Sequence, residues 1–152
     1  MSIVRRSVAE ALGTALLLAT VIGSGIMGER LAGGNAAIAL LANTLATGAA
    51  LIALILTFGP ISGGHFNPVV TLADAARCDI SWRVAQAYIV AQIIGAFTGV
   101  AVAHLMFAEP VFSISRHVRA GGAQIFSEFV ATFGLLLVIC RTAKLRRSLH
   151  PQ

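Results

Sequence analysis

The residues best suited to chemistry lie in one stretch, Ser62 to Thr71, which is Ser-Gly-Gly-His-Phe-Asn-Pro-Val-Val-Thr. Asn67 followed by Pro68 is typical of a helix start, because Asn caps a helix and proline at the first helical position loses no needed N–H. We therefore predict a short helix over residues 68–76. Its N-terminus carries about half a positive elementary charge, which disfavours cations and protons there.

Four residues, Gly63, Gly64, His65 and Phe66, lead to this cap. We expect them in an extended conformation with free carbonyl oxygens, while the Asn67 amide adds hydrogen-bond donors at the end of the series. Acceptors followed by donors suit single-file passage of water or small neutral polar solutes. The alternative interpretation is an ordinary surface turn capped by Asn67.

The stretch lies in a segment that is too apolar to face water. No charged residue occurs between Arg30 and Asp74, an interval of 43 residues. Because about 20 helical residues cross a bilayer core, the surplus returns to the surface or stays at membrane depth. Non-helical backbone persists at that depth only where protein buries it or a water-filled cavity solvates it. The prediction is a re-entrant loop that lines a cavity, as in a channel or transporter.

The composition also indicates a membrane protein. Hydrophobic residues make up 57% of the chain and charged residues 11%, and the mean hydropathy of +0.87 is unusual for a soluble domain. We predict an all-α membrane protein with spans near residues 7–28, 35–58, 82–107 and 121–141. A cleaved signal peptide is an alternative for residues 1–28, although that segment is longer than a usual signal core and contains Glu10.

Basic residues predict the orientation, because short cytoplasmic loops are enriched in Lys and Arg. We expect a multi-pass protein of a bacterial inner or plasma membrane, with both termini in the cytoplasm and residues 107–124 as an external connection. The cytoplasmic group has eight members, Arg5, Arg6, Arg77, Arg83, Arg141, Lys144, Arg146 and Arg147, and the external group has three, Arg30, Arg116 and Arg119.

A weak internal repeat links the two ends of the chain. Glu10 and Thr14 recur as Glu128 and Thr132, and three spans separate the copies, which would make an inverted repeat. We expect each glutamate to face inward and accept hydrogen bonds from N–H groups of a re-entrant loop. Only the loop for Glu10 occurs in this sequence. The alternatives are coincidence for the repeat and carboxylates that reach the membrane surface.

Other classes of function are not favoured. No nucleophile with an acid–base partner, cofactor-binding loop or metal-ligand spacing is visible, so we expect no enzyme activity, no cofactor and no metal. The net charge of +5 follows from the loop asymmetry, and no basic stripe interleaved with aromatic residues suggests nucleic acid. Cys78 and Cys140 are interpreted as free thiols.

These residues resemble the aquaporin and glycerol-facilitator family, the major intrinsic proteins, over nearly all of residues 5–141. The resemblance implies a six-helix bundle with two half-helices meeting at mid-membrane, four pores per tetramer and hence a homo-oligomer in the lipid bilayer. It also implies passive passage of water, glycerol, urea or neutral metalloid hydroxides. The motifs that carry it are Ala9-Glu10-x-x-Gly13-Thr14, the Ser62–Thr71 stretch and Ser127-Glu128-Phe129-x-x-Thr132.

Three departures from the family pattern matter. Val69 stands where the family usually has Ala. Thr47 matches a selectivity-filter position at which strict water channels have an aromatic residue, so a wider filter is expected. The 152 residues contain no second Asn-Pro motif, filter arginine or fifth and sixth span. We therefore expect a truncated member with impaired conduction; the alternatives are a non-conducting regulatory membrane subunit and a non-functional gene fragment.

Overall fold

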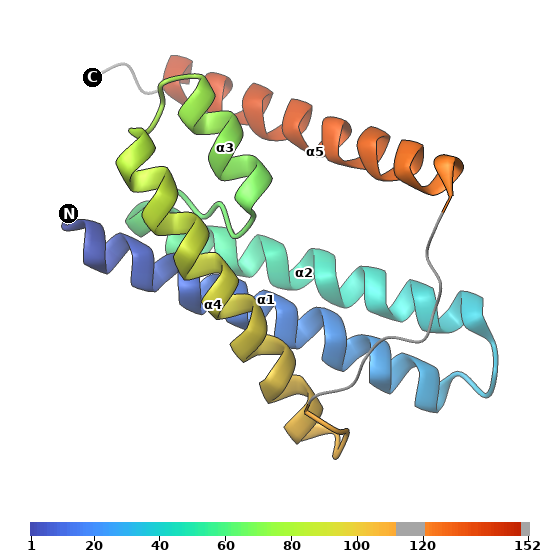
Figure 1. Ribbon diagram of the computed structural model, residues 1–152. Helices are drawn as coiled ribbons and strands as arrows, with labels where there is room; N and C mark the ends of the chain where they lie inside the picture. The colour runs from blue at the N-terminus through green and yellow to red at the C-terminus, as the bar shows by residue number, and fades with distance from the viewer. Residues whose placement is uncertain (112–120, 150–152) are drawn as a thin grey trace. The chain divides into compact units, whose positions relative to one another are not determined.

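A computed structural model describes residues 1–111 and 121–149, with side chains to residue 140, and its described parts contain helices and no strands (Figure 1). The predicted all-α fold class is confirmed. Helices α1 to α4 belong to one compact unit and α5 to a second. The helices are α1 (Ile3–Leu31), α2 (Ala36–Ser62), α3 (Pro68–Ala76), α4 (Trp82–Met106) and α5 (Gly122–Leu149).

Four segments are long and apolar enough to cross a bilayer: α1, α2, α4 and the Gly122–Cys140 part of α5. Only 6% of the most apolar window of α2 is buried, and 0% of that of α5. Large apolar side chains on the outside are compatible with hydrocarbon rather than water, and lipid gives no hydrophobic drive to hide them. The chain is an integral membrane protein.

Side-chain caps fix the beginnings of the first four helices. Ser2 and Ser81 accept hydrogen bonds from Arg5 N and Val84 N, each at 3.4 Å, and Asn35 accepts from Ala37 N at 3.0 Å. These bonds satisfy N–H groups that have no partner within a helix. Asn67 caps α3 in the same way and is described with the site.

Helix α2 continues about one turn beyond the predicted end of its span near residue 58. Pro60 lies inside the last turn, and the helix ends at Ser62, followed by Gly63 in a left-handed conformation with φ of 102°. A left-handed glycine is a common helix terminator. The loop that leads to Asn67 therefore begins directly at the end of α2.

Helix α1 packs against both α2 and α4, and α3 packs against α4. The crossing of α1 and α4 is very close because Gly95 and Gly99 have no side chains. A Cβ at Gly95 would lie 2.3 Å from the Ala11 carbonyl oxygen, and one at Gly99 would lie 2.2 Å from that of Ala15. Small residues commonly allow such backbone approach between membrane helices.

Candidate functional site

Asn67 lies at the N-terminus of α3, with φ of −150° and ψ of 124°. Its side-chain Oδ1 accepts a hydrogen bond from Val69 N at 2.8 Å, and its carbonyl accepts from Thr71 N at 3.1 Å. Pro68 occupies the first helical position. Because Oδ1 makes the cap, Nδ2 remains to donate, and no hydrogen bond from it occurs within the described residues. This corner offers an amide donor at the positive end of a helix.

The loop before Asn67 is not extended, so that prediction was wrong. Gly63, Gly64 and Phe66 have positive φ values of 102°, 68° and 48°. The chain must reverse within four residues after α2, and left-handed residues turn more sharply than extended ones. The tandem glycines permit this, whereas Phe66 adopts a conformation that is uncommon for a residue with a side chain.

A carboxylate holds this strained loop. Glu10 is fully buried; Oε1 accepts from His65 N at 3.0 Å, and Oε2 accepts from Phe66 N at 2.8 Å. Oε1 also accepts from Ser62 Oγ at 2.5 Å, and Oε2 from Gln92 Nε2 at 2.9 Å. All four partners are donors, which fits the acceptor-only chemistry of an ionised carboxylate. One side chain thus ties together α1, the end of α2, the loop and α4.

Two buried residues of α4 complete this network, and sequence reasoning missed both. Gln92 Nε2 donates to Thr71 Oγ1 at 2.9 Å as well as to Glu10. Tyr88 donates to the Ser62 carbonyl at 2.7 Å and accepts from Arg6 Nε at 2.8 Å. Their polarity within an apolar span was the available signal, because such groups need partners in a membrane.

His65 connects the loop to α3. Its Nδ1 lies 3.0 Å from Thr71 Oγ1, its Nε2 lies 3.3 Å from Asp74 Oδ2, and its ring meets that of Tyr88 edge to face. These contacts turn the His65 side chain toward α3 and α4. The described geometry therefore gives His65 a role in holding α3 as well as a place in the loop.

The Phe66 ring lies in a space that a glycine keeps open. A Cβ at Gly13 would come within 2.0 Å of the ring, and Phe58 packs on the ring edge to face with centroids 6.1 Å apart. Burial of Phe66 between α1 and α2 offsets its unfavourable backbone conformation. Gly13 and Glu10 both lie on α1 and both stabilise the same loop. Gly13 leaves space for the Phe66 ring, and Glu10 accepts hydrogen bonds from the loop backbone.

The remaining predicted site residues lie on helices. Thr47 is half-buried in the middle of α2 and donates to Asn43 Oδ1 at 3.3 Å. Val69 is exposed on α3. Glu128 is exposed on α5, which belongs to the second unit. Its inward role stays a prediction.

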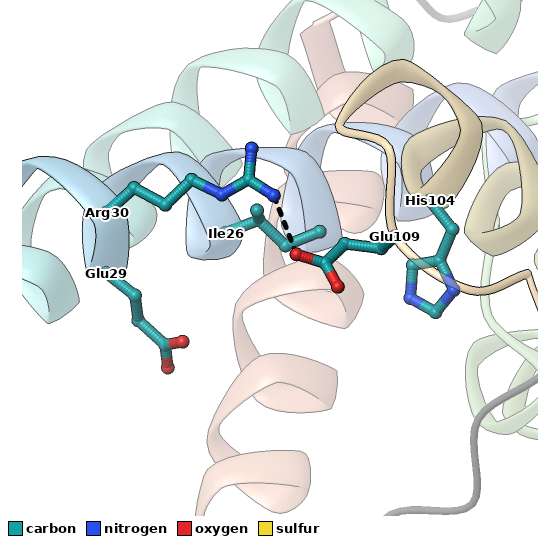
Figure 2. A pocket seen from close by; sticks show the side chains of 5 residues that line it. All are labelled: Ile26, Glu29, Arg30, His104 and Glu109. Carbon is teal, nitrogen blue, oxygen red and sulfur yellow. Dashed lines mark hydrogen bonds and ion pairs between the residues drawn. The ribbon is translucent and has the colours of Figure 1, made fainter.

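A pocket of about 400 Å³ opens where α1 and α4 end, away from the predicted residues (Figure 2). Arg30 donates to Glu109 Oε1 at 2.6 Å and to the Phe107 carbonyl at 2.7 Å, so the segment after α4 is held to α1. Ile26, Glu29 and His104 also line the pocket. Among the described residues, no group of three His, Cys, Asp or Glu side chains could hold a metal ion.

Long apolar helices, a short helix capped by Asn-Pro and a buried carboxylate that holds its loop define a polytopic membrane protein with a short helix between two of its spans. Residues 1–151 match the model of the major intrinsic protein family. The chain belongs to that family.

Known relatives agree with this assignment. The chain is 50% identical over 147 residues to aquaglyceroporin AqpS of Rhizobium meliloti (strain 1021), covering 97% of this chain and 63% of that protein. It is 35% identical to aquaglyceroporin-3 of Trypanosoma brucei brucei over 86% of this chain and 48% of that protein. It is also 35% identical to nodulin-26 of Glycine max, over 91% of this chain and 51% of that protein. The chain thus spans about half to two thirds of the length of these relatives.

Proposed function

We propose that this chain contributes the first half of a passive channel for water and small neutral solutes, such as glycerol, urea or neutral metalloid hydroxides. The observation that carries the proposal is the Asn67-capped half-helix, whose loop is fixed by Glu10. A free amide donor at the positive end of a helix suits neutral polar solutes and disfavours cations. Two relatives are named aquaglyceroporins, which supports the solute class.

In this proposal, solutes pass the carbonyl oxygens of Gly63 to Phe66 and the side chains of Asn67 and Thr47. Within the described residues, those four carbonyls accept no hydrogen bond from the protein. Thr47 is small and polar, so the constriction near it admits solutes wider than water. The proposal places both termini in the cytoplasm, Glu128 against a second loop and four copies of the complete channel in one bacterial plasma-membrane assembly.

A chimera tests the proposal. The 152 residues replace the matching part of AqpS, and glycerol and water permeabilities are measured in proteoliposomes by stopped-flow light scattering. We expect permeabilities above those of protein-free vesicles, reduced about tenfold by Asn67→Asp, because aspartate caps a helix as well as asparagine but has no amide donor.

Asn35→Asp is the matched control, since Asn35 caps α2 at an exposed position. It should leave both permeabilities unchanged. A folded, membrane-inserted chimera that conducts no better than empty vesicles, or one that conducts equally after Asn67→Asp, would contradict the proposed function.

A further inference from the structure

Thr47 makes a different hydrogen bond from the other helical threonines whose hydroxyl bonds are described. Thr20, Thr44, Thr57, Thr71 and Thr98 each donate to the backbone carbonyl four residues earlier, at 2.8 to 3.1 Å. Thr47 instead donates to a side chain, Asn43 Oδ1, at 3.3 Å. A helical threonine chooses between two rotamers according to the acceptor its hydroxyl finds. The partner at residue 43 therefore decides how Thr47 is oriented.

The orientation of the Asn43 amide is fixed by α1. Its Nδ2 donates to the Val21 carbonyl at 2.9 Å, and a carbonyl can only accept, so Oδ1 must be the atom that faces Thr47. Gly25 leaves the room for this contact, since a Cβ there would lie 2.9 Å from Asn43 Nδ2. An acceptor facing Thr47 obliges the Thr47 hydroxyl to donate.

We propose that Asn43 is a positioning residue that sets the solute preference of the path by holding the Thr47 hydroxyl as a pure acceptor. The single hydroxyl hydrogen is used by Asn43, so only lone pairs remain for a passing solute. Solutes rich in O–H donors, such as polyols, are favoured. This inference rests on the proposed function, in which Thr47 lines the path.

Loss of Asn43 has a defined consequence. Thr47 then bonds to the carbonyl of residue 43, as Thr44 bonds to that of Leu40. The Thr47 hydroxyl then turns from the Asn43 side chain toward the backbone of α2, which changes how its lone pairs are presented to a solute in the proposed path. The expected change is therefore in selectivity, separate from any change in stability.

The first experiment measures the Thr47 rotamer in the 152-residue chain in lipid nanodiscs, by NMR of selectively labelled threonine. Asn43→Leu should shift Thr47 χ1 and leave Thr44 and Thr57 unchanged. Gly25→Ala keeps Asn43 but displaces its amide, so it should shift Thr47 χ1 in the same way. This variant replaces Asn43→Leu in the experiment if Asn43→Leu does not fold. An unchanged Thr47 rotamer in the folded variants would overturn the proposal.

The second experiment measures the ratio of glycerol to water permeability in the AqpS chimera. Asn43→Leu and Thr47→Val should each lower the ratio about three- to tenfold, the effect of one hydrogen bond. The double variant should lower it no further, because both changes remove the same interaction. Thr47→Ser should preserve the ratio, and Thr44→Val is the control with no effect.

Failure of this inference and failure of the proposed function look different. A conducting chimera whose ratio does not respond to Asn43→Leu, or whose two single effects multiply, overturns the role of Asn43 and leaves the channel function standing. A folded chimera that conducts nothing, together with a shifted Thr47 rotamer, supports the Asn43–Thr47 bond and overturns the channel function and with it the claim about selectivity.

Discussion

Glu10 is fully buried in α1, yet its four hydrogen bonds go to residues of α2, the loop and α4. Two of them satisfy the N–H groups of His65 and Phe66, which sit in a loop with no ladder of its own. In a membrane, an unsatisfied backbone donor costs several kcal/mol because no water replaces the partner. The carboxylate supplies acceptors where the fold has none.

We predict that Glu10→Gln lowers the free energy of unfolding by about 2 to 4 kcal/mol. An amide has one acceptor oxygen, so at least two of the four donors face an NH₂ group and lose their partner. Glu29→Gln, at an exposed position in the last turn of α1, should change it by less than about 0.5 kcal/mol. Equilibrium unfolding in mixed micelles measures both. Equal stability of the Glu10 variant and the wild type would refute this account of the loop.

At the level of single residues, the sequence predicts the role of some residues of the site and not of others. Glu10 could be identified because a carboxylate in an apolar span needs partners, and Asn67 because Asn-Pro is a helix start. The left-handed Phe66 could not, since its conformation depends on a space left by Gly13 on a distant helix. Gln92 acts through contacts with Glu10 and Thr71 that only the packing of α4 on α1 and α3 creates.

Among the helices, the crossing of α1 and α4 positions the site, because it places Gln92 and Tyr88 against Glu10 and the loop. The crossing depends on Gly95 and Gly99 lying against the backbone of α1. The sequence predicts four apolar spans and a short helix, since these follow from local composition and caps. It does not predict which spans cross closely, because small residues occur in every span.

We predict that Gly95→Ala destabilises the folded chain by about 1 to 3 kcal/mol, as overpacking does, although alanine is the better helix former. Its Cβ would meet the Ala11 carbonyl oxygen, a backbone atom that cannot turn aside. Gly48→Ala on α2 is the matched control, because its Cβ would meet nothing within 4 Å. It should be neutral or stabilising by up to about 1 kcal/mol. The same unfolding assay separates them, and a stabilising Gly95→Ala would disprove the close crossing.

At the scale of the whole molecule, the described helices have many exposed large apolar side chains, and the described residues contain one half-helix, α3. The basic residues predict that both termini face the cytoplasm. Reporter fusions at Gln152 and at His117, both of which lie outside the described residues, test this orientation. Cytoplasmic activity is expected at Gln152 and external activity at His117. An external signal from Gln152 would exclude the four-span topology.

We also predict that the 152-residue polypeptide alone permeates glycerol and water close to the background of protein-free vesicles, with little effect of Asn67→Asp. Its one described half-helix has no facing partner, and its polar corner would meet lipid. Two copies inserted the same way would offer both half-helices from one side, whereas an inverted repeat needs one from each side. Strong permeation by this polypeptide that Asn67→Asp abolishes would contradict this prediction.

The most direct test of the account is the depth of α3 in the bilayer. Spin labels at Val69 and Ala76, both exposed, are introduced after Cys78→Ser and Cys140→Ser, and their depths are measured by power-saturation EPR in lipid vesicles. The account predicts Val69 near the bilayer centre and Ala76 toward the cytoplasmic headgroups, about 10 Å apart for a helical rise of about 1.5 Å per residue. Two labels at headgroup level would show that the half-helix lies at the surface and would contradict the re-entrant pore.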